Sequence, residues 1–291
     1  MIQLLINTIV SFNILLIIGY SFCYIYATIR FFHLAHAISL TFGAYFTFQL
    51  YIRSGVPLWI SVIMSVVCGV LLMLFCYHLL YKTLQKKEIE SWKMMVVSLG
   101  IYVILQNIVS IIWGDKRVSM KSWEILVGHE IMGGFITDVQ IITIAVCSII
   151  VIIAYLLGRL TNIGKKIQAS ASNPNMSSIL GISSNATKAF SMAIGTVMMS
   201  IAGVLIAADI DITPTMGFDW LLYGVVAMII SGTGRLYYLV FGSLLLAIIQ
   251  QLSSYCFDSK WMNATAYIIL VTFLYFRPFG FSGKKLKKTE V

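Results

Sequence analysis

The 291-residue chain is 59% hydrophobic but only 11% charged, and its mean hydropathy is +0.93. Because a typical soluble chain carries about 25% charged residues, this composition excludes a soluble enzyme. The formal net charge of +9 would suit nucleic-acid binding, but so few charges cannot build the basic grooves that bind phosphates. We expect the excess of lysine and arginine to report orientation in a membrane instead.

Nine apolar stretches are candidates to cross a bilayer. They run over residues 3–29, 33–52, 57–81, 94–113, 139–157, 187–208, 218–232, 236–255 and 261–277. Hydrocarbon cannot satisfy the backbone of a lone strand, so each stretch is predicted to be a helix. The predicted fold class is therefore all-α, a polytopic membrane bundle of eight or nine transmembrane helices, with 30–52 and 218–232 the segments most prone to be broken or re-entrant. We treat residues 1–291 as one membrane domain.

Basic residues fall unevenly on the two sides that these spans define. Fifteen of the twenty lie on one side, in Arg30, the 82–93 loop, the 158–188 loop, Arg235 and the C-terminal tail. The positive-inside rule makes this side cytoplasmic. Nine spans then place the N-terminus outside and the C-terminus inside, where the basic tail 284–291 would meet anionic lipid headgroups. On the outside, segment 114–138 is expected to be a lid or a short surface helix.

Catalytic, metal and nucleotide sites have little support in the sequence. The five cysteines lie in apolar runs without a C-x-x-C pair, which argues against a disulfide framework or a zinc site. No P-loop motif is present, so any ATP that drives the protein must bind to another chain. Without a nucleophile next to an oriented base, we predict no catalytic residues and no enzyme activity.

Two polar clusters remain as candidates for contact with a solute. His33 and His36 are three residues apart and would share a helix face, but no third ligand lies near enough in sequence to favour a metal site. They are expected to make structural hydrogen bonds or to line a polar pathway. Asp209, Asp211 and Asp219 lie at the expected external ends of the sixth and seventh spans, where they form either a solvated loop or a mouth that attracts an amino group.

The long cytoplasmic loop, 158–187, carries the strongest local signal. Asn173 followed by Pro174 predicts a helix start, because Asn caps free N–H groups and Pro suits the first helical position. Gly181 predicts the end of that helix. A helix of about seven residues is unstable in isolation. Its apolar face would therefore either dock in a partner's groove or pack on the protein's own helix ends; this face is formed by Met176, Ile179, Leu180 and Ile182.

The loop also carries a family resemblance. Ala169-x-Ala171-x-Asn173-Pro174, followed by Leu180-Gly181-Ile182, resembles the coupling-loop motif of permease subunits of ATP-binding-cassette importers of the branched-chain amino acid class. Other stretches resemble the same family in the same order: Arg30 to His36 with Gly43-Ala44-Tyr45-Phe46, Ala202 to Leu205, Pro214-x-x-Gly217 with Gly232-x-Gly234, and Arg277 to Gly283. The Phe31-Phe32-His33-x-Ala35-His36 stretch is similar to the first, smaller permease of the pair found in such importers.

The resemblance implies an assembly in the bacterial cytoplasmic (inner) membrane. Its partners would be a second permease in a heterodimer, two cytoplasmic ATPases that carry ATP and Mg, an extracytoplasmic substrate-binding protein, and membrane lipids; this chain itself would bind no cofactor and no nucleic acid. Branched-chain amino acids are the expected cargo, with other amino acids, urea and short amides as family alternatives. A self-sufficient secondary transporter or channel for a small polar solute remains the alternative class.

The resemblance also assigns roles to residues. The segment Pro174 to Leu180 would be the coupling helix, and the coupling residues are Ala169, Ala171, Asn173, Pro174, Met176, Ile179, Leu180, Gly181 and Ile182. The candidate pathway residues are His33, His36, Gly43, Tyr45, Gly232 and Gly234.

Four positions depart from the family pattern. Ala37 and Ile38 replace a glycine and a residue that is often polar or acidic, Ser231 replaces the first glycine of the glycine turn, and Gln168 stands where an arginine is usual. The first change bears on substrate identity. The last is expected to reflect a matched ATPase surface.

Overall fold

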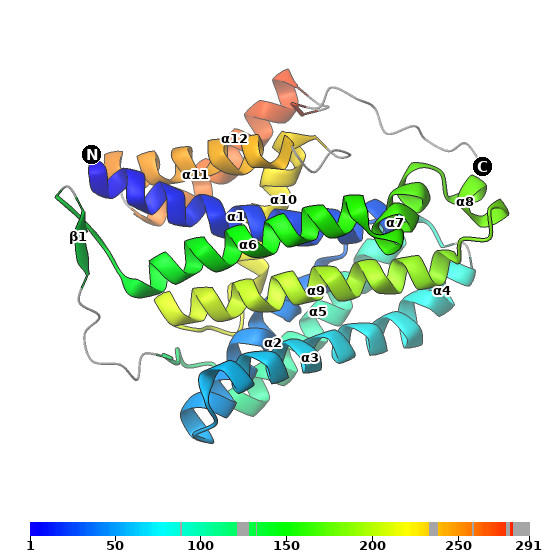
Figure 1. Ribbon diagram of the computed structural model, residues 1–291, viewed down its shortest axis with the longest axis horizontal. Coiled ribbons are helices and arrows are strands. Elements are labelled where there is room, and N and C mark those ends of the chain that lie inside the picture. Colours follow the sequence, from blue (N-terminus) through cyan, green and yellow to red (C-terminus); the bar gives the residue numbers. More distant parts are fainter. Residues whose placement is uncertain are drawn as a thin grey trace.

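Long apolar helices lying side by side form the body of the protein (Figure 1). The computed structural model describes residues 1–87, 89–120, 128–131, 133–232, 238–257, 259–277 and 280–281. Within these ranges, six helical segments are long and apolar enough to span a membrane: α1 (Ile2–Ile29), α3 (Leu58–Cys76) with its extension to Gln85, α5 (Ser91–Trp113), α6 (Asp138–Leu160), α9 (Ser184–Asp209) and α11 (Tyr238–Cys256). The extension of α3 consists of a π-helical turn (Tyr77–Tyr81) and α4 (Lys82–Lys86).

The remaining three predicted spans form shorter helices. A 3₁₀ turn (Leu34–His36) leads into α2 (Ala37–Phe48), which continues as a π-helical turn (Gln49–Arg53). The other two are α10 (Met216–Ser231) and α12 (Met262–Phe276), the latter preceded by a 3₁₀ turn (Ser259–Trp261). Helices thus occupy all nine predicted stretches, and the predicted polytopic helical membrane bundle is confirmed.

Glycines bring α2 against its neighbours at backbone distance. A Cβ built on Gly203 of α9 would lie 2.2 Å from the carbonyl oxygen of Leu40, and one built on Gly217 of α10 would lie 2.2 Å from that of Ala37. Figure 1 shows α2 and α10 crossing the long helices instead of running along them. The glycines of the family motifs therefore serve helix packing, as small residues do between membrane helices.

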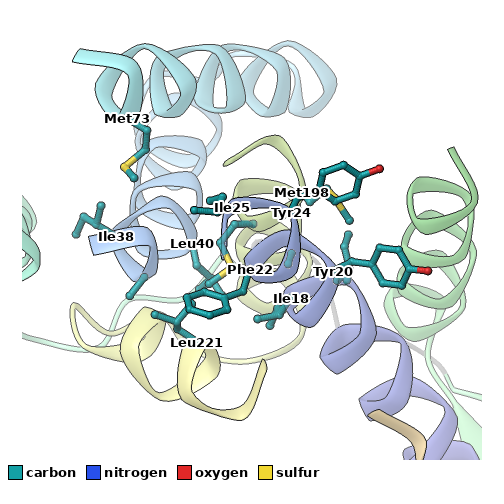
Figure 2. Packing of buried hydrophobic residues seen from close by; sticks show 14 of the residues in the cluster. Ile18, Tyr20, Phe22, Tyr24, Ile25, Ile38, Leu40, Met73, Met198 and Leu221 are labelled. Carbon is teal, nitrogen blue, oxygen red and sulfur yellow. The ribbon is translucent and has the colours of Figure 1, made fainter. Parts of the chain in front are cut away.

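Apolar side chains from four of these helices meet around the middle of α1. Figure 2 shows Phe22 and Ile25 of α1 close to Leu40 of α2 and Leu221 of α10, with Met198 of α9 next to Tyr24 on the other side of α1. All six are buried. This core holds the two crossing helices, α2 and α10, in place.

Segment 114–138, which we expected to be an external lid or a short surface helix, contains a β-hairpin. Strands β1 (His129–Ile131) and β2 (Gly134–Ile136) pair antiparallel. The side chain of Gln3 donates to the carbonyl of Phe135 (3.1 Å) and accepts from its N–H (2.8 Å), so the hairpin is fixed to the start of α1. The N-terminus and this hairpin therefore lie at the same end of the bundle.

Candidate functional site: the coupling loop

The predicted short helix forms in loop 158–187 as α8 (Pro174–Ile179). The Asn173 side chain accepts a hydrogen bond from the Met176 N–H (3.1 Å), and Pro174 occupies the first helical turn. This is the cap that the sequence predicted, and it satisfies one of the free N–H groups at the helix start. The helix begins where it does for purely local reasons.

Gly181 ends α8 in the left-handed conformation, at φ 79°. The N–H of Ile182 bonds to the carbonyl of Ser177 (3.0 Å) and that of Gly181 to the carbonyl of Ser178 (3.0 Å). This pair of bonds is a Schellman motif, which satisfies carbonyls that the helix end leaves free. Caps at both ends thus fix the length of a helix that is too short to be stable in isolation.

The apolar face of α8 points away from the protein. Met176, Ile179 and Leu180 are 55%, 80% and 71% exposed, whereas Ser177 is buried and Ile182 is half-buried. The first three side chains thus do not pack on the chain's own helix ends, which was one of the two predicted alternatives. An exposed apolar patch on a capped, short helix is typical of a surface that a partner covers.

A second helix, α7 (Asn162–Ser172), precedes α8 and was not predicted. Thr161 caps it by accepting from the Gly164 N–H (3.0 Å), and the chain turns sharply between α6 and α7. A Cβ on Gly164 would lie 2.2 Å from the carbonyl oxygen of Leu157, so only glycine fits this corner. Gln168 donates to the carbonyl of Gly158 across the same corner (2.7 Å), and this hydrogen bond joins α7 to α6. Gln168 is the position at which the family pattern has arginine.

Arg30 ties the coupling loop to the end of α1. Its guanidinium Nη2 donates to the carbonyl of Ala171 (2.9 Å), at the point where α7 ends and α8 is about to begin. Arg30 itself has φ 62°, a left-handed conformation that costs an arginine about 1–2 kcal/mol. The predicted coupling residues Ala169 and Ala171 are half-buried in α7, and Ala171 contributes its carbonyl to this contact.

The electrostatic environment of the loop is basic. Arg159, Lys165 and Lys166 are exposed around the α6–α7 corner, and the Arg159 guanidinium lies 5.1 Å from the centre of the Tyr155 ring. The exposed apolar patch of α8 is thus close in sequence to cations that would attract an acidic rim on a partner.

The predicted pathway residues lie inside the bundle. His33 and His36 are fully buried, with ring centres 6.3 Å apart. The Ser21 hydroxyl donates to the Gly195 carbonyl (2.8 Å), so it accepts from His36 Nε2 (2.5 Å), and this bond selects the tautomer of His36. His33 lies edge-on to Tyr81, at 4.8 Å between ring centres. Within the described ranges, both ring nitrogens of His33 and Nδ1 of His36 have no hydrogen-bond partner.

The other predicted pathway residues also have packing roles. Gly43 lies against Ser200 of α9, Tyr45 is fully buried with its ring 5.5 Å from that of Trp113, and Gly232 ends α10 with φ 87°. Gly234 lies outside the described residues, as does the basic tail 284–291. A pathway role for this set stays a prediction.

Comparison with known proteins shows which family has this sequence and architecture. A model of the family described as "Branched-chain amino acid transport system / permease component" matches residues 4–276. The chain belongs to this family. The class predicted from the motifs is thereby confirmed, and the protein is a multi-pass membrane permease component.

Relatives of this permease match it over nearly its whole length. It is 25% identical over 284 residues to the high-affinity branched-chain amino acid transport system permease protein LivH of Escherichia coli (strain K12), covering 93% of this chain and 91% of LivH. It is 23% identical over 295 residues to a probable LivH of Methanocaldococcus jannaschii, covering 97% and 93%. Its fold is similar to that of a chain in PsaBC from Streptococcus pneumoniae in complex with Fab, with a TM-score of 0.56, 16% identity, and coverage of 98% and 95%.

Sequence reasoning missed the residues that position the coupling loop of this permease. From the sequence, Arg30 is predicted only as a cytoplasmic charge and a motif residue, and no role is predicted for Gly158 or Gly164. A G-x₅-G spacing between an apolar span and a polar stretch was the available signal, but it is too weak to predict a helix corner alone. Assignment of individual coupling residues to contact with a partner stays a prediction.

Proposed function

We propose that this permease is the transmembrane subunit of an ATP-driven importer of amino acids, with branched-chain amino acids as cargo, and that it catalyses no reaction itself. Family membership supports the transport role. The observation that carries the coupling role is the exposed apolar face of α8, held on a helix that is capped at both ends. The cargo class is that of the relatives, which are named as branched-chain amino acid transport permeases.

The proposed assembly contains a second permease, two cytoplasmic ATPases that bind ATP and Mg, and an external substrate-binding protein. Met176, Ile179 and Leu180 would sit in a groove of one ATPase, while Arg159, Lys165 and Lys166 face its rim. When the ATPase dimer closes, α8 moves with it, and the Arg30–Ala171 contact passes that displacement to the end of α1. Alternating access then follows from two packings of the bundle that ATP binding biases.

Reconstitution of the complex tests this proposal. The wild-type chain, assembled with its partner subunits in proteoliposomes and supplied with binding protein and leucine, is expected to take up leucine only when ATP is present on the ATPase side. The Gly181→Pro variant should assemble but lose uptake, because proline cannot adopt φ 79° and removes the N–H that bonds to Ser178. Undiminished uptake by this variant would contradict the coupling role of α8.

The rival function, a self-sufficient secondary transporter, makes the opposite prediction. This chain alone in liposomes would then carry the solute, an uncoupler would abolish the flux, and ATP would have no effect. The exposed α8 face favours the importer, because a transporter that works alone has no use for an uncovered apolar patch on its cytoplasmic loop.

A further inference from the structure

Asp219 lies in the first turn of α10 and is exposed on the surface of this chain. Its carboxylate has no hydrogen-bond or ion-pair partner among the residues that the structure describes. From the sequence we expected it at the external end of a span, together with Asp209 and Asp211. The packing of α10 places it elsewhere.

The neighbour of Asp219 marks its depth in the bundle. The Phe218 ring stacks on the Tyr102 ring, at 5.0 Å between centres. Tyr102 is the middle residue of the 23-residue helix α5, eleven residues from Ser91 and eleven from Trp113. Further along α10, Gly224 lies against Ile18 and Gly19, near the middle of α1. The start of α10 is therefore deep between the two ends of the long helices, consistent with its crossing course in Figure 1.

Three tyrosines lie near the Asp219 carboxylate. Asp219 lies within electrostatic range of the hydroxyls of Tyr102, Tyr223 and Tyr267. Tyr102 and Tyr223 are largely buried, whereas Tyr267 of α12 is 36% exposed. The hydroxyl of Tyr223 is hydrogen-bonded to the Asn263 side chain, and its ring meets the Trp220 ring edge-on. Tyr102 and Tyr223 are thus held by their own contacts, and Asp219 has no counter-ion among the residues that the structure describes.

An exposed carboxylate at this depth cannot face lipid. Hydrocarbon would leave the charge unsolvated, so intramembrane carboxylates face a water-filled cavity or a partner and mark the paths of solutes. A carboxylate with aromatic side chains near it can also bind a primary ammonium, through a charge-assisted hydrogen bond to the carboxylate and cation–π attraction to a ring.

We propose that Asp219, with Tyr102, Tyr223 and Tyr267 near it, is a transient binding site for the α-ammonium group of the transported amino acid, on the face of this permease that borders the translocation pathway. This proposal rests on the proposed function and deepens it. It adds an anionic residue to the proposed pathway, and none of the other predicted pathway residues carries a negative charge. The site would select amino acids over the corresponding carboxylic acids, which lack the cation.

Uptake by the reconstituted complex tests the site. Asp219→Asn is expected to lower ATP-dependent leucine uptake at least about tenfold, since a hydrogen bond to a charged group is lost. Asp219→Glu should retain a measurable part of it. The matched control is Glu130→Gln in the β1–β2 hairpin, an exposed carboxylate outside every candidate site, which should stay within about twofold of wild type. If wild type transports leucine and Asp219→Asn equals it, the site is wrong while the importer function stands; if wild type transports no leucine, the proposed function fails first.

Cysteine labelling keeps the proposal falsifiable if Asp219→Asn fails to assemble. In a Cys256→Ser background, which removes the exposed native cysteine, Asp219→Cys in the assembled complex should react with a water-soluble methanethiosulfonate that carries an ammonium group, and leucine with binding protein and ATP should slow the reaction. Ile152→Cys, on the exposed apolar face of α6, should not react. If Asp219→Cys is unreactive in every nucleotide state, the residue is a structural contact with another subunit and the proposal is overturned.

Discussion

At the scale of single residues, two glycines and one arginine fix how the helices pack: Gly203, Gly217 and Arg30. Gly203 lets α9 approach the backbone of α2 at Leu40, and Gly217 does the same for α10 at Ala37. Between membrane helices there is no hydrophobic driving force, so close backbone packing is a main source of stability. A methyl group at such a contact must push two helices apart.

Gly203→Ala is therefore expected to destabilise the permease by about 1–3 kcal/mol, the usual cost of overpacking a close contact. The new Cβ would lie 2.2 Å from the Leu40 carbonyl oxygen, which cannot move without shifting α2. Thermal inactivation in detergent, followed by size-exclusion chromatography, measures the effect. Gly100→Ala is the control, because a Cβ there meets nothing within 4 Å, and its stability should equal or slightly exceed that of wild type. Equal melting of the two variants would show that α2 and α9 can separate freely.

Arg30 allows stability and coupling to be tested separately. Arg30→Gly should relieve about 1 kcal/mol of left-handed strain but lose the bond to the Ala171 carbonyl. We expect a chain at least as stable as wild type in detergent, with ATP-dependent uptake reduced several-fold because the loop is no longer tied to α1. Arg30→Lys keeps the charge and should have an intermediate uptake. Full uptake by Arg30→Gly would mean that motion passes from the loop by another route.

At the scale of secondary-structure elements, the coupling helix offers a surface test. Ile179→Glu places a charge on a side chain that is 80% exposed, so the isolated permease should fold and insert normally. Burying that charge in an apolar groove should weaken ATPase docking by about 2 kcal/mol or more, roughly thirtyfold. Co-purification of the ATPase measures this loss. Ser178→Glu is the matched control on the same exposed helix, and its docking should change little; a similar loss for both variants would indicate a general electrostatic effect instead of an apolar contact.

The sequence predicted α8 almost to the residue because its signals are local. Asn173, Pro174 and Gly181 act on backbone groups within a few positions, and no distant contact is needed to fix the two ends. The nine apolar stretches were predictable for a similar reason, since lipid demands continuous hydrophobic length. Helix α7 was missed because it depends on the glycine corner with α6.

Features set by distant contacts were out of reach of the sequence. The hairpin at 129–136 is fixed by Gln3, and the depth of Asp219 follows from the stacking of Phe218 on Tyr102. Each contact joins residues more than one hundred positions apart. The exposure of Met176, Ile179 and Leu180, in contrast, separates two alternatives that the sequence had left open.

At the scale of the whole molecule, the two ends of the bundle have different constructions. One end holds the N-terminus and the hairpin, which Gln3 joins. The other holds α7 and α8, which Arg30 joins to the end of α1. A 28-residue helix, α1, separates the two and is long enough to cross a bilayer. The hairpin and the coupling loop must therefore face opposite sides of the membrane.

Labelling from one side of the membrane tests which end is which. The fifteen basic residues on the loop side predict that α8 is cytoplasmic and the hairpin external. In a Cys256→Ser background, Glu130→Cys should react with a membrane-impermeant maleimide in intact spheroplasts, and Asn175→Cys only after the membrane is opened. Both positions are exposed, so access from water, not burial, decides the result. The reverse pattern would invert the topology and place α8 out of reach of any cytoplasmic ATPase; labelling of both positions in intact spheroplasts would mean that α1 does not span.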